Sequence, residues 1–263
     1  MAINVDKYSA DNSPLVSVIM PAYNAERFIK EAIASLQAQT HKNWELIVID
    51  DGSKDSTCKI LESVAEKDSR IRILKNEKNM GVAQTRNRGL KIVKGDYAAL
   101  LDSDDYWHPQ MLSKMIARAE ETKADIIYCS YEMVDEENKK LCSDFLVPEK
   151  TDFESSIIRS VITCSTSLIT KEFAQSHRFP TGVYHEDIAM WFSALREGCT
   201  ACGVKEVLAA YRQHPGSRSA GKIKSAKRRW AVYRKHLKLP FFKSVSTMIQ
   251  YAYYGFIKFK RIN

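Results

Sequence analysis

Three carboxylates follow a short apolar run near the middle of the chain. Residues 97–101 read as a strand buried on both faces, because such strands are short apolar runs that end at turn-forming residues. Asp102 and Asp104, two apart on extended backbone, point the same way, and Asp105 follows them. Carboxylates held close repel each other unless a cation offsets their charge, and their oxygens suit Mg²⁺ or Mn²⁺, which commonly bridge to phosphates. An isolated Asp-x-Asp is more often a solvated turn, but a preceding buried strand favours a ligand site, since open α/β sheets bind ligands at strand carboxyl ends.

Further polar clusters follow other expected strands of the first half. Residues 21–24 (Pro-Ala-Tyr-Asn) end the first strand and residues 50–53 (Asp-Asp-Gly-Ser) end the second. Residues 79–81 and 85–87, which include an arginine, lie at the start of a helix near them. An aromatic ring, carboxylates and a guanidinium around one crevice are the groups that a nucleoside diphosphate needs for its base, ribose and pyrophosphate.

Two motifs in the second half could also carry chemistry. Glu186 and Asp187 open an expected helix, where a carboxylate could act as a general base, although acidic residues favour helix N-termini in any case. Residues 211–217 (Tyr-Arg-Gln-His-Pro-Gly-Ser) hold an arginine and a histidine, but a lone histidine before proline is usually structural. His185 reads as a neighbour of the helix start rather than as a second base.

Strands that alternate with helices must position these groups. Their rhythm predicts a mostly parallel, Rossmann-like α/β sheet with right-handed crossovers. Asn24 and Ser53 are the expected caps of the first two helices, and Pro109 is expected in the first turn of the fourth. The expected strands cover residues 15–20, 44–49, 71–74, 97–101, 126–131, 163–169 and 201–211. Three helices are expected to begin after residues 24, 53 and 109, and two more are expected at residues 81–93 and 186–196. From residue 222 the sequence is helical and basic, with a break at Pro240.

Composition is that of a soluble globular protein, with 263 residues and a net charge of +8. The charge is uneven: after Glu206 the chain has no Asp or Glu and fourteen Lys or Arg, so the preceding part carries 26 basic and 32 acidic residues, a net charge of −6. A basic tail favours an anionic partner surface. The six scattered cysteines read as reduced thiols, and the N-terminus has no apolar signal core, so we expect a cytoplasmic protein.

The order and spacing of the motifs resemble the family 2 glycosyltransferases, which share the GT-A fold. The resemblance covers roughly residues 15–218 and extends to envelope-polysaccharide members of the teichuronic-acid type. It rests on four segments, at residues 16–40, 44–57, 79–105 and 185–191. With the residue pattern on either side, we expect a leader at 1–14, a GT-A domain at 15–219 and a C-terminal helical extension, basic and aromatic, at 220–263.

The resemblance also implies the role of each site residue. Asp187 would be the general base of an inverting displacement from a nucleoside-diphosphate sugar, most plausibly UDP-linked, onto an acceptor hydroxyl. Asp104 and His214 would hold Mn²⁺ or Mg²⁺. Tyr23 would stack near the base, Asp51 would accept from the uracil imide and Asp102 would face the ribose. The full set implied to bind the nucleotide sugar is Pro21, Ala22, Tyr23, Asp51, Asn79, Arg86, Asp102, Ser103, Arg212 and Ser217.

Two rival functions remain open from the residues alone. A sugar nucleotidyltransferase also uses a nucleotide-binding α/β domain and Mg²⁺, but a glycine-rich signature is expected after its first strand, where this chain has residues 21–24. A nucleic-acid-binding protein could use the basic tail, but the tail's aromatic residues form no recognisable stacking platform. We therefore expect no nucleic-acid partner, and the sequence leaves the oligomeric state open.

The tail at residues 222–263 mixes basic and aromatic residues. Its longest apolar-leaning run, at 244–257, is shorter than the roughly 20 apolar residues that a spanning helix needs. Cationic and aromatic side chains together suit a bilayer interface, so we expect attachment to the inner face of the cell membrane near a glycan or lipid-linked acceptor. The alternative is a helical hairpin packed on the catalytic domain, or a dimer contact.

Overall fold

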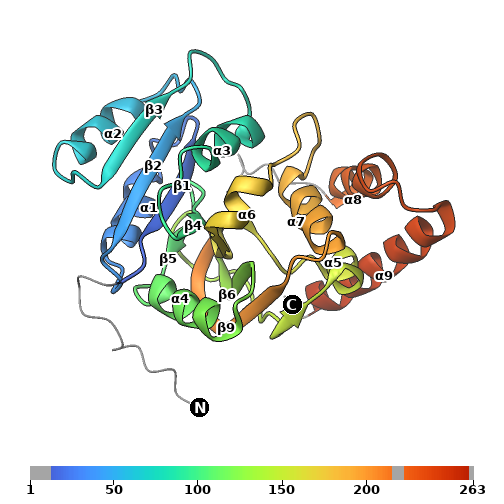
Figure 1. Ribbon diagram of the computed structural model, residues 1–263. Coiled ribbons are helices and arrows are strands. Elements are labelled where there is room, and N and C mark those ends of the chain that lie inside the picture. The colour runs from blue at the N-terminus through green and yellow to red at the C-terminus, as the bar shows by residue number, and fades with distance from the viewer. Residues whose placement is uncertain (1–12, 215–221, 261–263) are drawn as a thin grey trace.

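One continuous sheet forms the centre of the molecule (Figure 1). A computed structural model of the chain describes residues 13–214 and 222–260. The strand order is β3-β2-β1-β4-β8-β6-β9-β5, with β7 paired to β9. The long pairings β1 with β2, β2 with β3 and β6 with β9 are parallel, whereas β8 runs antiparallel between β4 and β6. The predicted mostly parallel α/β sheet is confirmed.

The first half alternates strands and helices as predicted. Its elements are β1 (Val16–Ala22), α1 (Ile29–Gln37), β2 (Trp44–Asp50), α2 (Thr57–Ala65), β3 (Ile71–Lys75), α3 (Val82–Leu90) and β4 (Tyr97–Leu100). Alternate residues of β1 face opposite sides of the sheet: Val18 lies in the core beneath α1, α2 and α4, and Ile19 lies in the core beneath α3, α6 and α7. Both faces of the sheet are therefore covered.

The second half adds elements of more varied length. They are β5 (Tyr106–Trp107), α4 (Met111–Thr122), β6 (Ile126–Val134), β7 (Lys150–Thr151), α5 (Phe153–Arg159), a 3₁₀ turn (Cys164–Thr166), β8 (Ser167–Thr170), α6 (Lys171–Ser176), α7 (Glu186–Arg196) and β9 (Ala201–Arg212). The helix predicted at 186–196 is confirmed. The strand predicted at 163–169 begins only at Ser167, because the residues before it form the 3₁₀ turn.

Two predicted helix caps are wrong. Asn24 has a left-handed backbone, and its side chain accepts a hydrogen bond from the backbone of Lys54 rather than from the first turn of α1. The hydroxyl of Ser53 accepts from the backbone of Asn24, so it caps no helix either. The two residues instead tie together the loops that follow β1 and β2. Each helix begins several residues later, α1 at Ile29 and α2 at Thr57.

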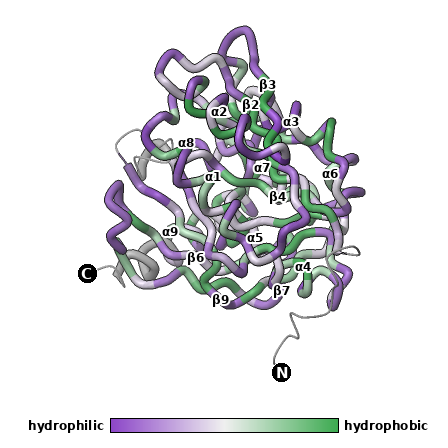
Figure 2. Tube along the Cα trace, turned by 90° about the vertical axis from the view of Figure 1, so that its left-hand side faces the viewer, coloured by the Kyte–Doolittle hydropathy of each residue, from purple (hydrophilic) through white to green (hydrophobic). Residues whose placement is uncertain are grey.

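The C-terminal helices pack on the sheet domain. They comprise α8 (Lys222–Ala231), a π-helical turn (Val232–His236) and α9 (Phe241–Lys260), drawn in red beside α5 and α7 in Figure 1. Val232, Tyr233 and Leu237 are buried in a cluster with Ile157 of α5 and Phe192 of α7. Figure 2 shows how hydrophobic strand segments lie inside more hydrophilic loops. Of the described helices, none is both long enough and apolar enough to cross a membrane.

Candidate active site

The carboxyl ends of β1, β2 and β4 bring the predicted polar clusters to one edge of the sheet. Ala22 pairs with Asp50, the residue before Asp51, and its carbonyl accepts a hydrogen bond from the Asp51 backbone at 2.8 Å. Asp102 follows two residues after β4, which lies on the other side of β1. Tyr23, directly after β1, leaves 48% of its surface exposed. The structure therefore places an accessible aromatic ring and two carboxylates at the same edge.

Asp51 anchors the loop that leads into α3. Its buried carboxylate accepts hydrogen bonds from the side chain of Asn76 at 2.7 Å, from the backbone of Met80 at 2.8 Å and from the backbone of Gly81 at 2.8 Å. Gly81 has a φ of 87°, a conformation that favours glycine. An ionised carboxylate can accept about four hydrogen bonds, so one site remains after these three. Asn79, predicted near the nucleotide, is exposed on the same loop.

His214, two residues after β9, contacts Asp104. The Nε2 atom of His214 lies 3.1 Å from Oδ2 of Asp104. Burial, and then the neighbouring charge of Asp102, raise the pKa of the Asp104 carboxyl, while its hydrogen bond to His214 opposes that shift. Ser103 lies half-buried between the two aspartates. The loop thus concentrates negative charge, and a cation would offset it.

The pair of Asp104 and His214 fits a divalent ion that takes its remaining ligands from phosphates. The described part of the chain contains no cluster of three or more potential metal-ligating side chains. Mg²⁺ and Mn²⁺ are commonly held by one or two protein groups together with water and substrate phosphate oxygens. A carboxylate and an imidazole at 3.1 Å are compatible with that arrangement.

Arg86 connects the loop after β4 to the start of α7. It is buried on α3, and its Nη2 atom lies 2.6 Å from Asp102 while its Nη1 atom lies 3.0 Å from Glu186. The resemblance implied that Arg86 helps to hold the nucleotide. In the structure its two Nη atoms bond to these two carboxylates. One planar side chain therefore fixes the spacing between the loop after β4 and the start of α7.

Asp187 lies half-buried in the first turn of α7. Burial and the adjacent charge of Glu186 raise the pKa of its carboxyl above the ordinary value. Before it, His185 adopts a left-handed backbone with φ 62° and ψ 49°, which is uncommon for a residue other than glycine. Such backbone outliers are concentrated at functional sites. Asp187 thus has a raised pKa, which favours its use as a general base near neutral pH.

Arg212 is placed differently from the expectation. Its side chain is only 1% exposed and donates to Glu31 of α1 at 2.7 Å, to Asn138 at 2.6 Å and to the backbone carbonyl of Asp104 at 2.8 Å. The backbone of Arg212 also donates to the buried carboxylate of Asp105 at 2.9 Å. Arg212 therefore holds the acidic loop in place rather than presenting its charge to a ligand.

Several supporting residues were not predicted. Besides Glu31 and Asn138, the amide side chain of Asn87 makes two hydrogen bonds with the backbone of Phe179, at 2.8 and 2.9 Å, and so holds the segment before α7 against α3. No sequence signal could have identified these pairs, because their partners lie far apart in the chain. Ser217, predicted in the nucleotide site, falls outside the described residues.

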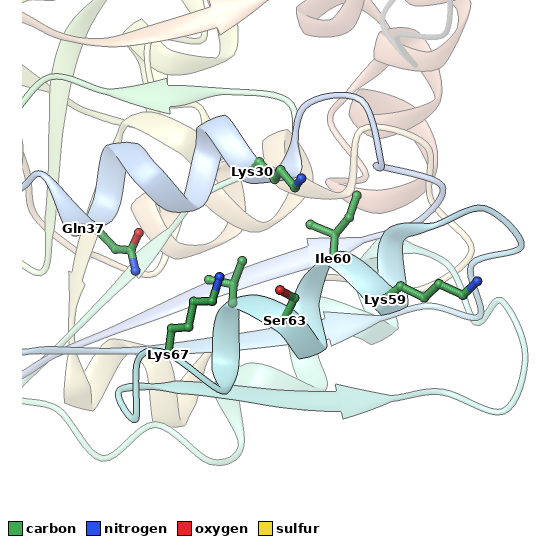
Figure 3. A pocket seen from close by; sticks show the side chains of 7 residues that line it. Lys30, Gln37, Lys59, Ile60, Ser63 and Lys67 are labelled. Atoms are coloured by element: carbon green, nitrogen blue, oxygen red, sulfur yellow. The ribbon is translucent and has the colours of Figure 1, made fainter.

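A surface cavity lies away from this edge. It has a volume of ≈ 410 Å³ between α1 and α2, on the outer side of the helices (Figure 3). Lys30, Lys59 and Lys67 surround it, and none of the predicted site residues lines it. We therefore place the active site at the strand ends and not in this cavity.

Comparisons with known proteins identify the family of this chain. The family model described as glycosyl transferase family 2 matches residues 17–175. The putative teichuronic acid biosynthesis glycosyltransferase TuaG of Bacillus subtilis is 36% identical over 91% of this chain and 95% of its own. The UDP-Glc:alpha-D-GlcNAc-diphosphoundecaprenol beta-1,3-glucosyltransferase WfgD of Escherichia coli is 36% identical over 83% of this chain and 85% of its own.

Solved structures share the fold. S. aureus TarS 1-349 in complex with UDP-GlcNAc superposes with a TM-score of 0.70 at 20% identity, over 90% of this chain and 71% of that one. The mannosyltransferase PcManGT from Pyrobaculum calidifontis, in complex with GDP-Man and Mn2+, superposes with a TM-score of 0.64 at 18% identity, over 86% of this chain and 64% of that one. The predicted GT-A fold is confirmed, and with the family match over most of the sheet domain it leads to one conclusion: this chain belongs to glycosyl transferase family 2 and is a glycosyltransferase.

Proposed function

We propose that this glycosyltransferase uses a nucleoside-diphosphate sugar, linked to UDP, and inverts the configuration at its anomeric carbon. The observation that carries the proposal is the bridge made by Arg86, which links Asp102 on the donor side at 2.6 Å to Glu186 at 3.0 Å. Because Glu186 is followed directly by Asp187, this bridge holds a candidate base at a fixed place relative to the donor loop. A UDP donor is supported by the UDP-GlcNAc and UDP complexes of TarS.

In this mechanism Asp187 takes the proton from the attacking hydroxyl of the acceptor. The hydroxyl oxygen then bonds to the anomeric carbon from the side opposite the diphosphate, and the bond from that carbon to the leaving phosphate oxygen breaks. Asp104 and His214 would hold Mn²⁺ or Mg²⁺, which supplies positive charge to the leaving diphosphate when bound. Asp51 and Arg212 would hold their two loops rigid, so that the protein groups that bind the sugar donor are in position before it arrives.

We propose that the acceptor is a cell-envelope glycan or a lipid-linked precursor. Support comes from the names of the relatives, since WfgD is named for an acceptor on diphosphoundecaprenol and TuaG for teichuronic acid biosynthesis. Such an acceptor would place the enzyme at the inner face of the cell membrane, in the cytoplasm.

The exposed face of α9 supports peripheral attachment to an anionic membrane through residues 222–263. Phe242, Ile249 and Tyr253 are 84%, 65% and 61% exposed, at the helical spacing that places them on one side of α9. The chain around them has no acidic residue after Glu206. Exposed apolar side chains next to basic ones suit the interface of a bilayer that contains acidic lipids.

Replacement of Asp187 by Asn tests the base. The change removes the proton acceptor but keeps the size of the side chain, so transfer should fall on the order of 10³-fold while UDP affinity stays within about twofold. Product formation and calorimetric titration with UDP would measure the two effects. Glu197→Gln, at the exposed end of the same helix, is the matched control and should leave both unchanged. Full transfer by Asp187→Asn would refute the assignment of the base.

A panel of nucleotide sugars tests the donor. UDP-sugars with Mn²⁺ should raise the melting temperature more than GDP-sugars, and chelation of the metal with EDTA should reduce that shift. The free acceptor position on Asp51 would serve the uracil imide. If only GDP-sugars stabilised the protein, the uracil contact at Asp51 would be wrong.

A further inference from the structure

The surface cavity between α1 and α2 is bounded by hydrogen bonds at both of its ends (Figure 3). Before the first turns of the helices, the backbone of Ala25 donates to the hydroxyl of Thr57 at 2.7 Å. At their other end, the Nε2 atom of Gln37 donates to the carboxylate of Asp68 at 3.0 Å. The volume of ≈ 410 Å³ between the helices is within the range of small-ligand sites. The fold itself therefore fixes the separation of the helices and the width of the cavity.

The cavity has an apolar middle and lysines at both ends. Ile60 and Val64 of α2 line it and pack against the core beneath the helices. Lys30 and Lys59 lie in the first turns of α1 and α2, whereas Lys67 follows the last turn of α2. Because β1 and β2 are parallel, the helices that follow them run in the same direction. Lys30 and Lys59 therefore lie toward one end and Lys67 toward the other, as Figure 3 shows.

The positive charge of these lysines is not balanced within the cavity. Among the residues that the structure describes, none that lines the cavity is acidic, and none makes a hydrogen bond or ion pair with the ammonium group of Lys30, Lys59 or Lys67. The nearby carboxylate of Asp68 pairs with Arg70 at 2.8 Å, so its charge is already offset. Lys30 and Lys59 also occupy first helical turns, where the helix macrodipole disfavours a cation. An anionic ligand would supply the missing negative charge.

We infer that this cavity is a second ligand site, which binds a small sugar with a phosphate group at each end. A lysine ammonium binds phosphate as a point charge, and each phosphate ester carries about −1.5 to −2 charges at pH 7. The sugar ring would lie over Ile60 and Val64, beside the hydroxyl of Ser63. No aromatic ring among the described lining residues offers a stacking surface for a base, so a sugar phosphate fits better than a nucleotide. The inference is independent of the proposed function, because no residue of the candidate active site lines the cavity.

Calorimetric titration of the full chain tests the site, with UDP and Mn²⁺ present to fill the donor site. The probes are glucose 1,6-bisphosphate, glucose 6-phosphate and glucose. The bisphosphate should bind most tightly, the monophosphate more weakly and glucose not measurably, because each phosphate group adds a charge-assisted contact to a lysine. Binding of the bisphosphate should also weaken as the salt concentration is raised, since the lysines are exposed.

Substitution of a single lysine locates the binding. Lys67→Gln removes the charge at one end of the cavity, so it should weaken binding of the bisphosphate about tenfold, toward the affinity of the monophosphate. Lys67→Arg keeps the charge and should retain most of the affinity. Lys91→Gln is the matched control, because Lys91 is an exposed lysine at the end of α3 that does not line the cavity. It should bind all three probes as the wild type does.

Three results would overturn the inference. The first is wild-type protein that binds no probe, or binds glucose and its bisphosphate equally. The second is Lys67→Gln that binds the bisphosphate as the wild type does, which would place the ligand elsewhere, for example in the donor site. The third is complete displacement of the bisphosphate by an equal concentration of sulfate, which would show only a general attraction for anions. Sugar transfer by the same preparation judges the proposed function separately: transfer without bisphosphate binding removes this site and leaves the function.

Discussion

Adjacent carboxylates at the start of α7 have separate tasks. Glu186 is buried and bonded to Arg86 at 3.0 Å, so it holds the helix start against α3. Asp187 is half-buried, and its pKa is raised by burial and by the charge of Glu186. The first residue therefore helps to position the second, and its charge adds to the effect of burial in raising the pKa of the second.

The raised pKa of Asp187 predicts an acid limb in the pH profile. The base works only when deprotonated, so kcat/KM should rise with pH through a midpoint above the ordinary aspartate pKa of about 3.9. Glu186→Gln removes a negative neighbour, which lowers the pKa of Asp187, so this midpoint should move to lower pH even though the lost Arg86 contact reduces the maximal rate. The profile of kcat/KM from UDP release would measure it, with Glu197→Gln as control. A midpoint that stays in place or moves upward would contradict the assignment of the limb to Asp187.

Residue types in the site could be predicted from the sequence, but their partners could not. Asp51, Asp102 and Asp104 follow recognisable strands, and parallel strands bring their carboxyl ends together. Arg86 and Arg212 were assigned to the nucleotide through the family resemblance. The carboxylates that bind them, Glu186 and Glu31, are 100 and 181 residues away along the chain, a separation at which no local pattern operates.

The packing of α3 on β1 depends on the absence of a side chain at Gly89. A Cβ atom there would lie 2.5 Å from Cγ2 of Ile19 and 3.1 Å from Cδ1 of Ile49. Since α3 also carries Arg86, a displacement of this helix would move the bridge between Asp102 and Glu186.

We therefore predict that Gly89→Ala is destabilising. Glycine to alanine inside a helix ordinarily stabilises a protein by about 1 kcal/mol, but the overlap with Ile19 should reverse the sign and lower the free energy of unfolding by about 2 kcal/mol. Urea denaturation would measure the change, and sugar transfer should fall with it. Ile19→Ala combined with Gly89→Ala should cost less than the sum of the two single changes, because it removes the clashing atom. Additive effects would show that the two residues do not compete for the same space.

Long periodic elements were predicted well and short ones were not. The helix predicted after residue 24 is confirmed as α1, and its apolar face is buried at Ile29, Ala32, Ile33 and Leu36. The elements β5, α5 and α6 were missed, because stretches of two to seven residues show no clear apolar period. Their positions are set by neighbours in the fold: β5, for example, forms by pairing Tyr106 and Trp107 with residues of β9.

At the scale of the whole molecule, the C-terminal helices have an inward and an outward face. The inward face buries Val232, Tyr233 and Leu237 against α5 and α7, as the helical-hairpin alternative required. The outward face of α9 exposes Phe242 and Ile249. Packing on the domain and the proposed contact with a membrane would therefore use different sides of the same segment. Removal of the whole segment would uncover the inward face, so surface substitutions are the sharper test.

Replacement of Phe242 and Ile249 by serine should weaken attachment to membranes. Both side chains are exposed, so the change should leave the melting temperature within about 1 °C while it removes apolar area that would enter the bilayer. Co-sedimentation with phosphatidylglycerol vesicles would measure binding, which should also weaken as salt is raised.

Leu146→Ser is the matched control, because Leu146 is 68% exposed but lies outside the C-terminal helices. It should sediment like the wild type. Equal binding by the double variant and the wild type would rule out α9 as the attachment surface.

The hydrogen bonds of Arg212 also have a consequence for the order of synthesis. The strands that precede Asp51 and Asp102 emerge from the ribosome early. Arg212, which donates to the carbonyl of Asp104, and His214, which contacts its carboxylate, lie at the end of β9 and just after it, and are made later. A nascent chain that stops before β9 could form the β1, β2, β3 and β4 part of the sheet, yet its acidic loop would lack Arg212 and His214. Catalytic competence is thus acquired only when nearly the whole sheet domain has been translated.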